Sequence, residues 1–161
     1  MKPTWIIIAL VSGTFLPIQA ALNARLGKSI DNPAVAALIS FVIGAIALSV
    51  YVIITKQSVS WAAIKTVPPY AWLGGLLGAF YVTAIIFAFP RIGPALTFGL
   101  IVTGQMIIAI LLDHFNILVT QQHSINAWRI LGVVLIIAGV VIIRNFKSHS
   151  IKIIPAKLYL Q

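Results

Sequence analysis

The feature that most constrains this chain is a series of long apolar segments that contain no charged residue. No Asp, Glu, Lys or Arg lies within 3–24, 32–55, 66–90 or 92–112, and a shorter uncharged run covers 130–143. About 20 apolar helical residues cross a hydrocarbon core of about 30 Å. The runs therefore predict five membrane spans. The fifth reaches full depth only if it begins near residue 125, with the Arg129 side chain extending to the interface.

Composition agrees with a fold that lies almost entirely in lipid. Of 161 residues, 61% are hydrophobic and 8% are charged, which is far from the usual composition of soluble domains. Backbone groups in lipid must be hydrogen-bonded within the protein, and the alternating pattern of barrel strands is missing, so the spans are predicted to be helices. Pro33 and Pro94 are each expected to open a helix, where the missing proline N–H costs nothing. We expect an all-α, polytopic membrane protein with a transmembrane domain at 1–146, spans at about 4–24, 33–55, 69–89, 93–112 and 125–144, and a basic tail at 147–161.

The net charge of +9 would suggest nucleic acid as a partner if the protein were soluble. Here the basic residues gather at the ends of the spans and in the tail, which fits lipid headgroups, and we expect no nucleic-acid partner. Five spans place the two termini on opposite membrane faces. The N-terminal face carries Lys2, Lys56, Lys65 and Arg129, and the other face carries Arg25, Lys28, Arg91, Arg144, Lys147, Lys152 and Lys157.

This distribution favours an external N-terminus and a cytoplasmic C-terminus, because Lys and Arg accumulate in cytoplasmic loops. Without the residues beyond Arg144, however, each face carries four basic residues. The bias therefore depends on the tail, and insertion in both orientations stays open. The expected location is the inner membrane of a bacterium.

Residue types needed for catalysis are largely missing. Cysteine is absent, which excludes disulfides and thiolate metal sites. Intramembrane hydrolysis needs paired aspartates, a Ser/His couple or metal ligands, and none occurs at a usable spacing. There is no phosphate-binding loop either. We expect no enzyme activity, no cofactor and no metal.

Polar residues gather on one face of the first span. Ser12, Leu16, Gln19 and Asn23 follow i, i+4, i+7, i+11 spacing, and Pro17 frees a backbone carbonyl nearby. One interpretation is the polar lining of a solute pathway, since the Gln19 amide can both donate and accept hydrogen bonds. The alternative is hydrogen bonding between helices, with Asn23 capping the end of its helix.

The fourth span carries a second deep amide, Gln105, which shares a face with Phe98 at seven-residue spacing. Two isolated glutamines on two different helices favour a pathway between them, lined by Gln19, Asn23, Phe98, Gln105 and Ser12. The alternative is that the two amides pair with each other and hold the helices together.

Charged residues lie where the fourth span ends and where the fifth span begins. A carboxylate at a helix C-terminus and a guanidinium near a helix N-terminus each oppose the helix dipole. We therefore hypothesise that Asp113 and Arg129 pair across the connection between these spans. His114 lies beside them as a group that can take up a proton, so the three could gate or couple movement through the pathway. The alternative is two unrelated interfacial charges.

Taken together, these positions resemble a known family. The pattern comprises Gln19 and Asn23, Asn32-Pro33, Gly74-Gly75-x-x-Gly78, Gly93-Pro94-Ala95, Gly104-Gln105 and Asp113-His114-Phe115. It is similar to the small five-helix YdcZ-type branch of the drug/metabolite transporter superfamily, over about residues 4–145. The four-helix multidrug exporters of that superfamily use a membrane-embedded glutamate for proton exchange, whereas this chain has no glutamate.

The resemblance implies half of a ten-helix transporter with inverted repeats, so that a homodimer or a paralogous heterodimer would complete the pathway. Small-residue ridges at Ala71, Gly74 and Gly78, and at Gly132 and Gly139, offer surfaces for close helix packing. We expect a transporter of a small organic solute that acts as a dimer. The alternative is a non-transporting membrane assembly subunit whose polar residues only pack helices.

Overall fold

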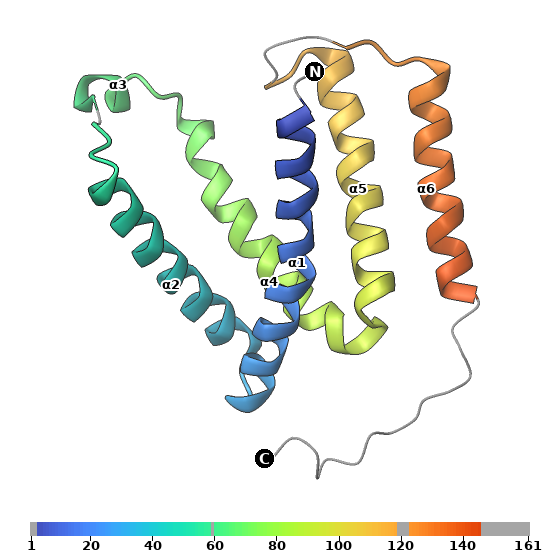
Figure 1. Cartoon of the computed structure of the whole chain (residues 1–161), viewed down its shortest axis with the longest axis horizontal. Helices are drawn as coiled ribbons and strands as arrows, with labels where there is room; N and C mark the ends of the chain where they lie inside the picture. The colour runs from blue at the N-terminus through green and yellow to red at the C-terminus, as the bar shows by residue number, and fades with distance from the viewer. Residues whose placement is uncertain (1–2, 59, 119–122, 146–161) are drawn as a thin grey trace. The chain divides into compact units, whose positions relative to one another are not determined.

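The computed structural model describes residues 3–58, 60–118 and 123–145. The described residues form α1 (Pro3–Ser29), α2 (Pro33–Ile54), the short α3 (Trp61–Lys65), the 3-10 turn η1 (Pro69–Trp72), α4 (Leu73–Ile92), α5 (Pro94–Phe115) and α6 (Ala127–Asn145) (Figure 1). Five segments of this described part are long and apolar enough to cross a membrane: α1, α2, η1 with α4, α5 and α6. The predicted all-α fold with five membrane-spanning helices is confirmed.

Proline and its neighbours set two of the helix starts as expected. α2 begins at Pro33, and the Asn32 side chain caps it by accepting a hydrogen bond from the Val35 amide at 3.1 Å. α5 begins at Pro94, directly after Gly93. Gly93 has a φ of 83°, which glycine adopts without strain, so the chain can turn sharply between α4 and α5.

Other boundaries differ from those expected. α1 continues to Ser29, five residues beyond the expected end at 24, because a helix can extend past the hydrocarbon once its backbone bonds are made internally. The connection after α2 contains α3, where the Ser60 hydroxyl accepts a hydrogen bond from the Ala63 amide at 3.3 Å. The predicted basic tail at 147–161 lies outside the described residues.

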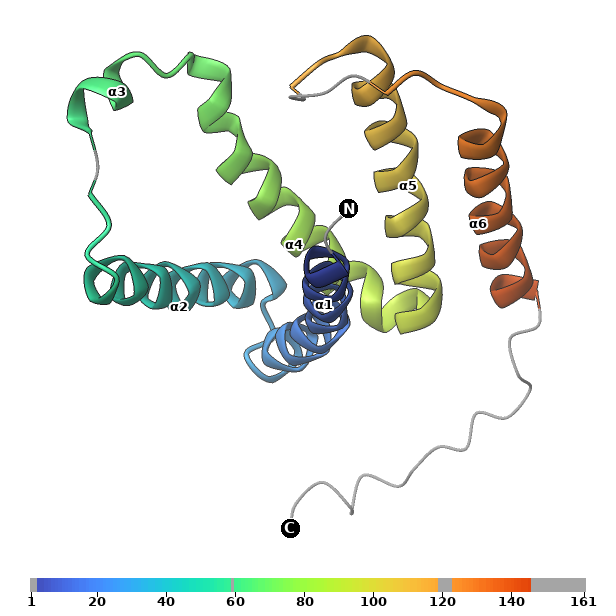
Figure 2. The ribbon, with the colours of Figure 1, turned by 45° about the horizontal axis from the view of Figure 1, so that its top comes forward.

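The chain divides into two compact units, residues 1–97 and 98–161. In the first unit α1, α2 and α4 pack together, and α2 and α4 approach each other near the end of α1 and diverge towards α3 (Figure 2). The buried centre consists of Ala36, Ala37 and Ile86. Gly27 permits this close approach, because a Cβ atom there would lie 3.2 Å from the Pro33 Cα.

The second unit contains most of α5 and all of α6. Here the tightest approach is at Gly99, where an added Cβ atom would lie 2.8 Å from Cγ2 of Val140, a buried residue of α6. Valine is stiff at χ1, so glycine is the residue that fits at this contact.

Large apolar side chains cover the outside of the described helices. Leu10, Phe80 and Trp128, for example, are 72%, 76% and 80% exposed. Soluble proteins rarely expose contiguous apolar surface on this scale, whereas in a bilayer the lipid covers it. The small buried centre of the first unit is therefore what a membrane protein needs, since lipid replaces most of the core.

Candidate functional site

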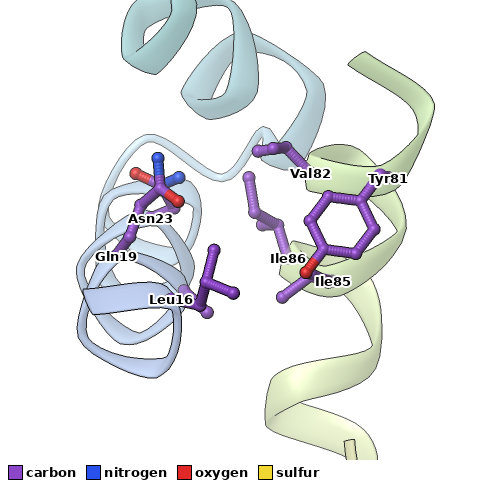
Figure 3. Close-up of a pocket in the computed structure, with 8 residues that line it drawn as sticks. Leu16, Gln19, Asn23, Tyr81, Val82, Ile85 and Ile86 are labelled. Atoms are coloured by element: carbon purple, nitrogen blue, oxygen red, sulfur yellow. The ribbon is translucent and has the colours of Figure 1, made fainter. Parts of the chain in front are cut away.

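Gln19 and Asn23, two of the polar residues of the first span, line hollows in the first unit. The smaller lies between α1 and α4 and has a volume of about 10 Å³, which is room for about one water molecule. In Figure 3, Gln19 and Asn23 project from α1, and the Tyr81 hydroxyl points from α4 into the space between the helices. The lining residues are Leu16, Gln19, Ala20, Asn23, Tyr81, Val82, Ile85 and Ile86.

The larger hollow adjoins the smaller one, because Gln19 and Val82 line both. Its volume is about 300 Å³, and it adds Ser40, Phe41, Gly44, Ala45 and Leu48 of α2. Among the residues that the structure describes, no charged side chain lines either hollow. The arrangement offers amides and hydroxyls on a mostly apolar wall, which can bind a neutral, hydrogen-bonding molecule but has no ion to pair with a charged one.

Asn23 is held inside the first unit. It is 6% exposed, and its Oδ1 accepts a hydrogen bond from the Ser40 hydroxyl at 2.5 Å. The suggestion that Asn23 caps its helix is wrong, because α1 continues for six residues beyond it to Ser29. The other suggestion, a hydrogen bond between helices, describes this contact correctly.

Gln19 differs from Asn23 in its surroundings. Its side chain is exposed, and it stands where the two hollows meet. Ser12 lies on the same face of α1, about two turns closer to the N-terminus. Its side chain is exposed and lies outside both hollows. Gln19 is therefore the exposed polar side chain of α1 that lines both hollows.

The remaining predicted residues belong to the second unit. Gln105 is exposed on α5, and Phe98 is half-buried. A shared cavity for Gln19 and Gln105 stays a prediction, since the two residues lie in different units.

The hypothesised ion pair is present in the second unit. Nη1 of Arg129 lies 3.0 Å from Oδ2 of Asp113, and each side chain is 29% exposed. The same Arg129 nitrogen donates to the His123 carbonyl at 3.0 Å, and the Ile125 amide donates to Nδ1 of His114 at 3.4 Å. These contacts fasten the chain that precedes α6 to the end of α5.

Comparison with known proteins identifies the family to which the chain belongs. The sequence model of the family described as "Putative inner membrane exporter, YdcZ" matches residues 4–142. The chain belongs to the YdcZ family. Inner membrane protein YdcZ of Escherichia coli (strain K12) is 28% identical over 109 residues, which cover 66% of this chain and 72% of that protein. No solved structure matches the chain.

Membership of the YdcZ family confirms the resemblance noted in the sequence. It is a family of membrane exporters by description and not a family of enzymes. The family and the five apolar helices together identify a multi-pass protein of the inner membrane.

Sequence reasoning about this YdcZ-family chain missed two polar residues of the site. Ser40 donates to Asn23 from α2, and Tyr81 lines the smaller hollow from α4. Each is a polar residue inside an uncharged apolar run, which is the same signal that identified Gln19. Spacing along one helix defines a polar face but does not reveal which neighbouring helix meets it.

Proposed function

We propose that this protein exports a small, uncharged organic solute across the inner membrane and that Gln19 contacts the solute. The observation that carries the proposal is the position of Gln19. This residue lies on the membrane-spanning helix α1, where two hollows lined by uncharged residues meet. The description of the family as exporters supports the direction of movement.

The energetics of an amide in a membrane favour a wet site at Gln19. An amide without a hydrogen-bonding partner in a low-dielectric region costs about 1–3 kcal/mol. Asn23 has such a partner inside the protein, because its side-chain oxygen accepts a hydrogen bond from Ser40. Gln19 is exposed instead, so water or solute in the adjoining hollow would satisfy it.

We propose further that a second copy, or a paralogous chain, completes the pathway, with Gln105 and Phe98 lining its other part. An exposed Gln105 on a spanning helix would otherwise face lipid, which is unfavourable for an amide.

The contacts of Asp113, His114 and Arg129 would brace or gate one end of the pathway, because they fasten two spanning helices of the second unit at their membrane boundary.

The test compares small molecules in the medium of cells that express the wild-type chain with those in the medium of cells without it. Mass spectrometry then needs no prior guess of the solute. A solute that accumulates outside only with the wild type is measured again in proteoliposomes. Gln19→Leu and Gln105→Leu should each reduce the flux of this solute at least about tenfold, at unchanged protein level. Each substitution removes an amide that hydrogen-bonds to the solute, so the polar groups of the solute are left unpaired.

A matched control is Ser49→Leu. Ser49 is a polar residue of α2 that bonds to the Ala45 carbonyl of its own helix and lies outside both hollows. Its substitution should leave flux unchanged. Normal flux in both glutamine variants would place the pathway elsewhere. If no solute moves with the folded wild-type protein, the non-transporting assembly subunit becomes the better description.

A further inference from the structure

A second, charged groove opens in the first unit, at the ends of α1 and α4 and the beginning of α2. Its volume is about 350 Å³. Three charged residues line it: Lys28 in the last turn of α1, Asp31 in the turn before α2, and Arg91 in the last turn of α4. Between them lies an apolar wall that includes Pro33, Ile86 and Phe87.

The three charges do not neutralise one another. Within the described part of the chain, no ion pair of 4.0 Å or less joins Asp31 to Lys28 or to Arg91. Nη1 of Arg91 donates to the Phe87 carbonyl, and the guanidinium lies 5.4 Å from the centre of the Phe87 ring. Since a guanidinium has five N–H donors, others stay available for a ligand.

The position of the groove points to the lipid headgroup region. Lys28 and Arg91 follow uncharged runs that cross the hydrocarbon, and Asp31 precedes another. The charged rim therefore lies at the membrane boundary, while the apolar wall continues into spanning helices. A molecule that fits must carry both charge and a long apolar part, which describes a phospholipid better than a soluble ion.

We propose that this groove binds an amine-bearing phospholipid of the phosphatidylethanolamine type. The phosphate would interact with Lys28 and Arg91, the ammonium with Asp31, and one acyl chain would lie along the wall formed by Pro33, Ile86 and Phe87. Basic pockets between spanning helices are known to hold lipid phosphates. The acid decides the headgroup, because a purely anionic lipid would leave Asp31 facing like charge.

The test is native mass spectrometry of the full-length protein in an equimolar mixture of phosphatidylethanolamine, phosphatidylglycerol and phosphatidylcholine with identical acyl chains. The wild type should retain phosphatidylethanolamine about two- to fivefold over phosphatidylglycerol, as expected for one exposed ion pair. It should also retain phosphatidylethanolamine over phosphatidylcholine, because the quaternary ammonium of choline has no N–H group to donate to Asp31. Asp31→Asn should abolish the preference over phosphatidylglycerol. Asparagine suits this position, since Asp31 has a φ of 51° and asparagine accepts the left-handed conformation readily.

Two further variants and one control complete the experiment. Lys28→Gln and Arg91→Gln should each lower retention of all three lipids, because both remove a partner of the shared phosphate. Arg144→Gln, which removes a basic residue at the end of α6 and outside the groove, should leave retention unchanged. A wild-type preference for phosphatidylglycerol that grows in Asp31→Asn would overturn the amine assignment. Equal retention of the three headgroups by the wild type would overturn it as well. Retention unaffected by all three groove variants would overturn the site itself.

Discussion

Asn23 and Gln19 lie one helical turn apart on α1, yet their amides meet different surroundings. The Asn23 amide is buried and accepts a hydrogen bond from Ser40, whereas the Gln19 amide is exposed at the junction of the two hollows. A hydrogen bond between membrane helices is worth about 0.6 kcal/mol on average and up to about 1.7 kcal/mol. Asn23 therefore contributes to stability, and Gln19 is the better candidate for contact with solute.

Removal of the Ser40 hydroxyl should measure the first of these roles. Ser40→Ala leaves Oδ1 of Asn23 without its donor, so we expect the free energy of unfolding in micelles to fall by about 1 kcal/mol. Asn23→Ala combined with Ser40→Ala should cost less than the sum of the single substitutions. Ser49→Ala is the control, because its hydroxyl donates to the Ala45 carbonyl of its own helix. Additive effects of Asn23→Ala and Ser40→Ala would contradict a direct bond.

At the level of helices, Gly27 decides how closely α1, α2 and α4 approach. A Cβ atom at Gly27 would lie 3.2 Å from the Pro33 Cα and 3.3 Å from Cγ2 of Ile86. Backbone atoms of Pro33 cannot rotate away, so Gly27→Ala should destabilise the first unit by about 1–3 kcal/mol. Thermal unfolding in detergent, followed by circular dichroism, measures the loss.

Gly13 on the same helix provides the matched control. An added Cβ atom there has no neighbour within 4 Å among the described residues. Gly13→Ala should therefore be neutral or stabilise α1 by about 0.5–1 kcal/mol, since alanine is the better helix former. Equal losses for the two variants would mean that glycine acts through helix flexibility rather than through packing.

Helix positions were predictable where length and apolarity decide them, and less so elsewhere. Uncharged runs gave five spans, and Pro33 and Pro94 marked two helix starts. The run ends at Arg25, but α1 continues to Ser29, because a charged residue ends the hydrocarbon span without ending the helix. The partner of Asn23 was not predictable, since Ser40 lies on another helix and only packing brings them together.

The ridges of small residues show the same division between pattern and packing. Gly78 lies against the Phe41 ring, with 3.7 Å from an added Cβ atom to Cζ. An added Cβ atom at Gly74, Gly132 or Gly139 would meet nothing within 4 Å among the described residues. The sequence pattern identified surfaces suited to close packing, but it could not tell which of them the chain itself covers.

For the whole molecule, an odd number of spans predicts termini on opposite membrane faces. Reporter fusions after Gln161 and within the α5–α6 connection at 116–118 should report opposite sides, because α6 crosses the membrane between them. At each site, the enzyme activity of an alkaline phosphatase fusion is compared with the fluorescence of a fluorescent-protein fusion, and the ratio of the two signals distinguishes the sides. In a population with one orientation, the same side for both sites would contradict five spans. Mixed signals at both sites would instead indicate insertion in both orientations.

The last prediction concerns a second copy of the chain. Gln105 is exposed, and Gly74 has no neighbour among the described residues. An amide that faces lipid costs free energy, and the small surface at Gly74 is suited to close contact with another helix. A helix from a second copy could cover both positions. The chain has no cysteine, so single cysteines can be introduced without background. Gly74→Cys should form covalent dimers with a short thiol cross-linker in native membranes.

Gly78→Cys is the matched control, one turn further along the same ridge. Its surface is already covered by Phe41, so it should cross-link far less than Gly74→Cys. If dimerisation uses this ridge, Gly74→Leu should also lower the dimer fraction by at least about tenfold, since a large side chain prevents close helix approach. A dimer that survives Gly74→Leu would use another surface. Monomer alone at every expression level would mean that one chain must form its pathway without a partner, and the inverted-repeat proposal would then fail.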